Sequence, residues 1–129
     1  MEVLDRNESM KLLATQRFGR AVFNLDGLPV ALPVNFVLVD GDVFFASSAG
    51  SKLDKAVKRA VMSLETDWVD PTCQTGWSVL VTGRAKHVTD STTRQHVLAQ
   101  LSDWAPGSQR HIVRVPSTYV SGRRLSRKT

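Results

Sequence analysis

The sequence predicts a mainly β (α+β) protein, built as one six-stranded antiparallel barrel with short flanking helices. Its 129 residues fit a single domain of ordinary size, and no repeat or linker divides them. Asp-Gly pairs at 26–27 and 40–41 separate three apolar runs. Such pairs favour two-residue hairpins, because a type I′ turn needs positive φ at both central positions. Six strand-like runs and about three short helix-like runs follow from the hydrophobic periodicity.

The first half of the chain is expected to form a helix, a three-stranded meander and a second helix. Residues 5–16 place apolar side chains at helical spacing, with Asp5 or Asn7 as the N-cap. A second helix is expected at 51–60, where Ser51 and Asp54 make a capping-box-like pair with Asp in place of Glu. The two hairpin turns connect strands at 18–25, 28–39 and 42–48.

The second half is expected to add three strands and one helix. Gly83 interrupts the long strand at 77–88 and predicts a bulge or a sharp bend there. Pro116 favours an edge position or a bulge in the last strand, 111–122. The remaining elements are a strand at 61–68, a loop at 70–76, a helix at 90–101 begun by Asp90 or Ser91, and a loop at 105–107.

Composition limits the classes of function. Cys73 is the single cysteine, so no intramolecular disulfide forms and we expect a reducing, cytoplasmic setting. The charged N-terminus lacks a signal-peptide core, and the longest apolar run, 30–39, is too short to span a bilayer. The net charge of +5 suits anionic ligands. No RNA-recognition, zinc-finger or helix-turn-helix signature accompanies it, so we expect neither nucleic acid nor a membrane as partner.

Residues that carry chemistry by themselves are sparse. His87, His96 and His111 have no metal-ligand spacing, so we predict no metal site and interpret them as packing or surface histidines. Cys73 has no obvious base nearby in the sequence. If the protein is an enzyme, a bound cofactor is expected to supply the chemistry, and no catalytic residue is assigned.

The segment 44–60 leaves a strand, crosses a patch of Ser, Ala and Gly, and enters a cationic helix. Ser47, Ser48 and Ser51 offer hydroxyl donors, Lys52 adds charge, and the helix N-terminus exposes free N–H groups. An anion site, such as one for a phosphate, fits this pattern. An ordinary strand-to-helix connection with a solvated face fits it equally well.

Two further features have a structural and a functional interpretation. Asn35 interrupts an apolar run, so its amide is expected to need a partner inside the barrel, or a flat heteroaromatic ligand. Trp77 and Ser78 open the long strand. Trp77 suits a core position, and it also suits one edge of a stacked ring system.

Taken in order, four segments resemble the pyridoxamine 5′-phosphate oxidase-like family of flavin-binding split barrels. The segments are "RFGRAVFNLDGLPVALPVNF", "GDVFFASSAGSKLDKA", "GWSVLVTGRAKHV" and "YVSGRR", and they cover nearly the whole chain. The resemblance implies a split β-barrel over residues 1–129. It also implies a homodimer with flavin mononucleotide (FMN) in the clefts between subunits.

The resemblance also implies the cofactor-binding residues. The isoalloxazine ring is expected beside "PVNF" and "FASS", the phosphate beside "SK", and "WSV" is expected to reach the flavin from the partner subunit. Ser51 departs from the second cation that the family often has in the phosphate-binding pair. The residues implied are Pro33, Val34, Asn35, Ala46, Ser47, Ser48, Ser51, Lys52, Trp77 and Ser78.

The function that follows is an FMN-dependent oxidoreductase that transfers hydride to or from an unidentified small molecule. One alternative keeps the fold and places a deazaflavin in the same groove as the cofactor of a reductase. Another is a non-catalytic protein that holds flavin or another cofactor as a carrier or sensor. A nucleic-acid-binding barrel comes last among these interpretations.

Overall fold

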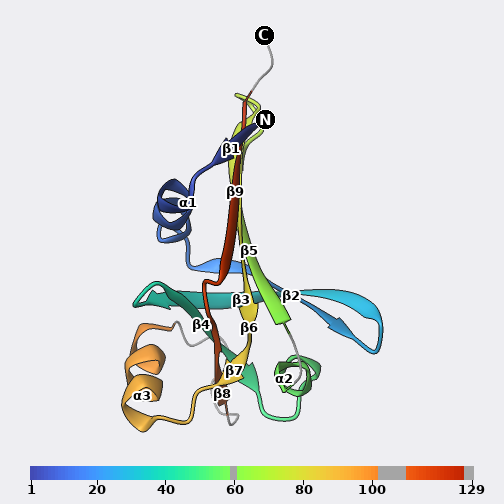
Figure 1. Cartoon of the computed structure of the whole chain (residues 1–129), viewed down its shortest axis with the longest axis vertical. Helices are drawn as coiled ribbons and strands as arrows, with labels where there is room; N and C mark the ends of the chain where they lie inside the picture. Colours follow the sequence, from blue (N-terminus) through green and yellow to red (C-terminus); the bar gives the residue numbers. More distant parts are fainter. Residues whose placement is uncertain (59–60, 102–109, 127–129) are drawn as a thin grey trace.

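The computed structural model describes residues 1–58, 61–101 and 110–126. Within them the strands form one curled antiparallel sheet, in the order β1-β9-β6-β5-β2-β3-β4-β8-β7 (Figure 1). The strands are β1 Glu2–Leu4, β2 Phe18–Leu25, β3 Leu28–Val39, β4 Asp42–Ser48, β5 Val61–Asp70, β6 Thr75–Arg84, β7 Lys86–His87, β8 Arg110–Val115 and β9 Tyr119–Leu125. The helices are α1 Arg6–Leu13, α2 Lys52–Val57 and α3 Ser91–Gln100. This is the expected split-barrel architecture.

Both Asp-Gly hairpins are confirmed. Asp26 and Gly27 have φ of 51° and 82°, and Asp40 and Gly41 have φ of 51° and 79°. These values are those of a type I′ turn, in which both central residues have positive φ. The turns fix the register of the meander, pairing Leu25 with Leu28 and Val39 with Asp42.

The six predicted strands are present, but two of them are interrupted. Residues 77–88 divide into β6 and β7 at Ala85, and the last strand divides into β8 and β9 around Pro116. A Cβ on Gly83 would lie 2.1 Å from the Pro116 carbonyl oxygen, so glycine permits the close approach of these two bends. The short β1, which pairs with β9, was not predicted. The predicted loop at 105–107 lies outside the described residues.

The helices begin at the predicted caps. The Asp5 side chain accepts a hydrogen bond from Glu8 N at 2.8 Å, and the Asp90 side chain accepts one from Thr93 N at 2.8 Å. Ser51 Oγ accepts from Asp54 N at 3.1 Å, so the first half of the capping box is confirmed. The second half differs, because the Asp54 carboxylate accepts from Gly50 N at 2.8 Å instead of from the cap residue. None of the described helices has the length and apolar character to cross a membrane.

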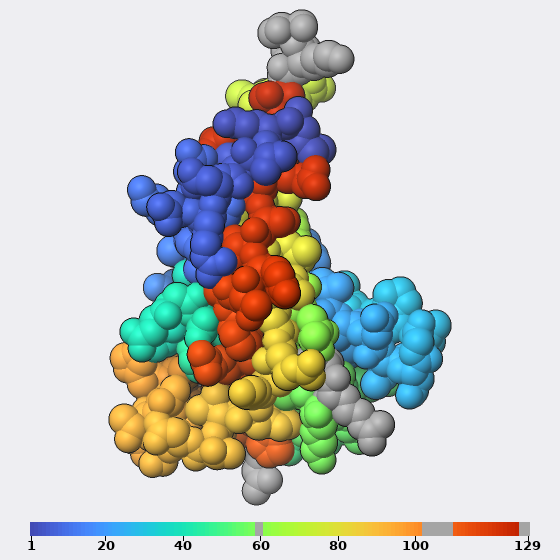
Figure 2. Space-filling view, in the orientation of Figure 1, coloured from blue at the N-terminus to red at the C-terminus, as the bar shows by residue number. Residues whose placement is uncertain are grey.

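Two apolar clusters lie on opposite sides of the sheet. The larger fills the barrel, where Phe45 and Leu64 are fully buried, and Leu13 of α1 belongs to the same cluster. The smaller lies where α3 covers β3, β4 and β8, and joins Val97 to Val37, Phe44 and Ile112. Figure 2 shows α1 and the N-terminal segment over the upper end of the molecule and α3 at the lower end.

Candidate functional site

The pleat of the sheet divides the predicted cofactor residues between two faces. Register pairs Arg20 with both Pro33 and Glu65, and pairs Glu65 with Leu80. Paired residues share a face, so these four side chains lie in one row across β3, β2, β5 and β6. We call this side the outer face. Leu80 is 37% exposed and Phe18, nearby on the same face, is 50% exposed.

Asn35 and Ser78 lie on the outer face, each two residues along its strand from that row. Three inter-strand steps separate them, which corresponds to about 14 Å along the sheet. The Asn35 Oδ1 atom is buried, yet no hydrogen-bond donor among the described residues reaches it. An acceptor buried without a partner costs about 1–3 kcal/mol, so this oxygen is suited to a donor from outside the chain.

Val34 and Trp77 lie on the opposite, barrel-facing side. Trp77 is 8% exposed and belongs to the main core cluster, against which Val34 also packs. Of the two interpretations offered for Trp77, the core position describes its place within one chain. Its role toward a cofactor stays a prediction.

The serine-rich end of β4 also divides between the faces. Ala46 and Ser48 alternate with Ser47 along the strand, and Ala46 packs at the edge of the α3 cluster. Ser47 is buried, and its Oγ donates to Asp54 Oδ1 at 3.0 Å. Ser51 and Lys52 follow at the start of α2, where Lys52 is exposed. The turn between β5 and β6 lies at the opposite end of the molecule from α2 (Figure 1), so one chain does not bring Trp77 close to Lys52.

Asp54 is the centre of a polar cluster that the sequence pattern did not indicate. His87 Nε2 lies 2.9 Å and His111 Nδ1 lies 2.8 Å from Asp54 Oδ1. Burial by itself raises the pKa of Asp54, but hydrogen bonds from Gly50 N–H, His111, His87 and Ser47 outweigh it and hold that pKa well below its usual range. The three residues are far apart in sequence, so no spacing motif could have identified them.

A second charged cluster lies on the outer face. Arg20 Nη1 is 2.8 Å from Glu65 Oε1 and 3.2 Å from Asp67 Oδ2. Burial and the neighbouring Asp67 raise the pKa of Glu65 to about 7, although Arg20 acts in the opposite direction. This carboxyl therefore changes its charge near neutral pH, in the same row as Pro33 and Leu80.

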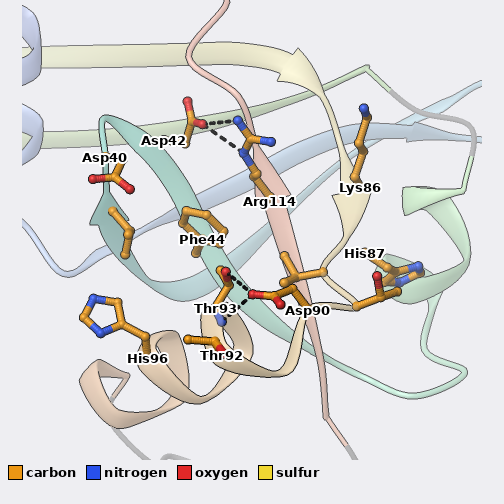
Figure 3. A pocket seen from close by; sticks show the side chains of 13 residues that line it. Asp40, Asp42, Phe44, Lys86, His87, Asp90, Thr92, Thr93, His96 and Arg114 are labelled. Carbon is orange, nitrogen blue, oxygen red and sulfur yellow. Dashed lines mark hydrogen bonds and ion pairs between the residues drawn. The ribbon is translucent and has the colours of Figure 1, made fainter.

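A pocket of about 610 Å³ lies between α3 and the sheet and contains none of the predicted cofactor residues (Figure 3). Two of its lining carboxylates already have partners, since Asp42 accepts from Arg114 Nε at 2.9 Å and Asp90 caps α3. His96 points toward this pocket from α3. The outer face, with its unpartnered acceptor, is therefore the better candidate for a cofactor.

The family model described as "Pyridoxamine 5′-phosphate oxidase" matches residues 5–124. This chain belongs to that family. The curated relative Rv0080 of Mycobacterium tuberculosis, described as an uncharacterized protein, is 36% identical over 127 residues, which are 95% of this chain and 84% of the relative.

Two solved structures share this fold over nearly the whole chain. The FAD binding protein from Mycobacterium smegmatis is 33% identical, with a TM-score of 0.82 over 95% of this chain and 98% of its own. A FAD-binding protein from Mesorhizobium loti is 25% identical, with a TM-score of 0.84 over 98% of this chain and 97% of its own. Both of these structural neighbours are named as FAD-binding proteins.

Proposed function

We propose that this protein binds a flavin nucleotide on the outer face of its barrel and uses it as an oxidoreductase. The observation that carries the proposal is the buried Asn35 Oδ1, which accepts no hydrogen bond from the described residues. A flavin ring offers a matching donor in its imide N–H. The names of the M. smegmatis and M. loti relatives support a flavin as the ligand.

The chain's own groups would hold the cofactor in two regions. Pro33, Asn35 and Ala46 would bind and orient the ring, which supplies hydride transfer when bound. Ser48, Ser51 and Lys52 would hold the phosphate through hydroxyl and ammonium donors, since charge-assisted hydrogen bonds are stronger than neutral ones. Ser47 would act less directly, because its hydroxyl already donates to Asp54.

The site is proposed to be completed by a second copy of the chain. Phe18, Leu80 and Tyr119 are 50%, 37% and 71% exposed, which leaves apolar surface on the sheet. A symmetric dimer would cover such a surface and bring Ser78 of one subunit to the cofactor of the other. Trp77 would support Ser78 from the core side.

FMN is the cofactor that the compact group of Ser51 and Lys52 suits best, since it carries one terminal phosphate. The relatives named as FAD-binding favour the larger nucleotide. A non-catalytic flavin-binding role is the second candidate, and the words "binding protein" in those names favour it. A deazaflavin is the alternative cofactor, and with it the protein would be a deazaflavin-dependent reductase.

The first experiment is equilibrium titration of the cofactor-free protein with FMN, FAD and a deazaflavin under the same conditions. Lys52→Ala should weaken binding of the preferred cofactor about tenfold to a hundredfold, because a charge-assisted contact is worth about 1.5–3 kcal/mol. Lys58→Ala, at the other end of α2, is the matched control and should bind normally. If no flavin binds, or if Lys52→Ala binds as well as the control, the proposal or its phosphate site is wrong. Reduction of the loaded protein by a hydride donor, followed by reoxidation with turnover, separates the enzyme from the carrier.

A further inference from the structure

The cluster of Asp54, His87 and His111 has the composition of a metal site. It combines one carboxylate with two imidazoles, and its three ligand atoms all lie within 4.8 Å of one another. The cluster lies on the barrel-facing side of the sheet at the end closed by α2. None of its members belongs to the predicted cofactor residues.

Three separate elements bring the ligands together. Register pairs Ser47 of β4 with His111 of β8, and pairs His87 of β7 with Val113 of β8. His87 and His111 are therefore diagonal neighbours on adjacent strands, with ring centroids 5.2 Å apart in an edge-to-face arrangement. The first turn of α2 then places Asp54 against both rings. Strand pairing and the position of α2 therefore hold these three side chains together without a bound ion.

The hydrogen bonding of Asp54 is unevenly shared between its two oxygens. Oδ1 lies within 3.0 Å of Ser47 Oγ and of both imidazole nitrogens, whereas Oδ2 accepts only from Gly50 N among the described residues. A carboxylate oxygen has about two lone-pair directions, so three donors exceed what Oδ1 accommodates well. Coordination to a shared ion would replace the two imidazole N–H donors and relieve this crowding.

From this geometry we propose that Asp54, His87 and His111 bind one divalent first-row transition metal ion of the Zn²⁺ type. Imidazole and carboxylate ligands suit such ions, whereas Mg²⁺ and Ca²⁺ require more oxygen ligands than the three residues supply. In a tetrahedral zinc site the ligand atoms are about 3.3 Å apart. Each imidazole nitrogen, now 2.8–2.9 Å from Asp54 Oδ1, would therefore move about half an ångström away from that oxygen. The side chains of His87 and His111 are 27% and 46% exposed, which gives an ion access and leaves a position for water.

The groups around the ligands would hold them in place. Gly50 N–H donates to Asp54 Oδ2 and Ser47 Oγ donates to Asp54 Oδ1, and both orient the carboxylate as outer partners of metal ligands commonly do. Lys86, the neighbour of His87, pairs with Arg114, so the pleat turns its side chain to the opposite face of the sheet. The proposed ion would join α2 to β7 and β8.

The test is metal binding by the full-length protein without a polyhistidine tag, stripped with chelator and carrying Cys73→Ser to remove an exposed thiol. Zn²⁺ affinity is measured by competition with a chromogenic chelator, and Co²⁺ is used as a spectroscopic probe through its visible d–d absorption. We expect one equivalent to bind. His87→Ala and His111→Ala should each weaken binding at least tenfold and reduce the Co²⁺ bands.

His96→Ala is the matched control, because His96 is an exposed histidine on α3 with Gln100 as its partner at 2.9 Å. It should retain wild-type affinity. Far-UV circular dichroism of each metal-free variant checks folding. If an alanine variant does not fold, His111→Gln takes its place, because His111 is the more exposed of the two histidines. Absence of saturable binding would overturn the proposal. The three residues would then form a hydrogen-bonded cluster without a metal ion. Binding unchanged by the His87 and His111 substitutions, or lost equally in His96→Ala, would overturn it as well.

Discussion

Replacing Asn35 by leucine should have opposite effects on stability and on cofactor binding. Leucine has nearly the same shape as asparagine but no polar atom, so the variant removes the buried Oδ1 that lacks a partner. The cofactor-free protein should become more stable by about 1–3 kcal/mol, the usual cost of an unsatisfied buried group. The unfolding entropy of a 129-residue chain is about 0.27 kcal/mol/K, so the Tm should rise by roughly 4–11 °C.

Flavin binding should fall in the same variant. A flavin N–H that loses its acceptor in a desolvated site costs about 1–3 kcal/mol, which corresponds to a roughly fivefold to 150-fold weaker affinity. Thermal unfolding of the cofactor-free protein and a fluorescence titration with FMN and FAD measure the two effects. The added flavin should therefore raise the Tm of the wild type more than that of the variant.

Val37→Ala is a useful comparison, because Val37 lies two residues further along the same face and is buried under α3. It should lower the Tm without the selective loss of flavin affinity, since a core cavity reduces stability only. If Asn35→Leu destabilises the cofactor-free protein and binds flavin like the wild type, Asn35 has an internal partner and the argument for the outer face fails.

Two other predictions rest on described contacts, and a third rests on the proposed dimer. Glu65 has a pKa of about 7 against an ordinary 4.5, so the fold favours its protonated form and stability is lost as pH rises from 4.5 through 7. Glu65→Gln should equal the wild type in urea unfolding at pH 4 and exceed it at pH 7.5, and an equal difference at both values would contradict the assignment. Gly83→Ala should lower the free energy of unfolding by about 1–3 kcal/mol, because its Cβ would meet the Pro116 carbonyl oxygen at 2.1 Å; an unchanged denaturant midpoint would show that the bend yields easily. If a dimer shares its sites, mixing Lys52→Ala chains with Ser78→Asp chains should restore flavin binding at one of the two sites of each mixed dimer. Sedimentation as a monomer, or a mixture that still binds no flavin, would exclude the shared site.

Local sequence signals determined most of the fold. The Asp-Gly pairs predicted both hairpins, because positive φ is a local requirement that few residues meet. Asp5, Ser51 and Asp90 predicted the helix starts for a similar reason, since a cap bonds to an N–H only three residues away. The breaks in the fifth and sixth predicted strands, at Ala85 and Pro116, were indicated only by Gly83 and by Pro116 itself.

Identifying the candidate cofactor site required both the sequence pattern and the tertiary structure. Asn35 stood out in the sequence as an amide within an apolar run, but only the tertiary structure shows that its Oδ1 finds no partner. Trp77 and Ser78 are adjacent in sequence, yet the pleat sends Trp77 into the core and Ser78 to the outer face. Which side of a sheet becomes the core depends on what packs against it, and a sequence pattern states only that two sides alternate.

The Asp54 cluster was decided by tertiary structure alone. His87 and His111 become neighbours because β7 pairs with β8 at one register, and Asp54 reaches them because α2 closes that end of the barrel. Hairpin turns and helix caps are satisfied within a few residues, so the sequence by itself determines them. Contacts between residues 54, 87 and 111 exist only after the sheet has curled, because strand pairing and helix docking set distances that no local spacing encodes.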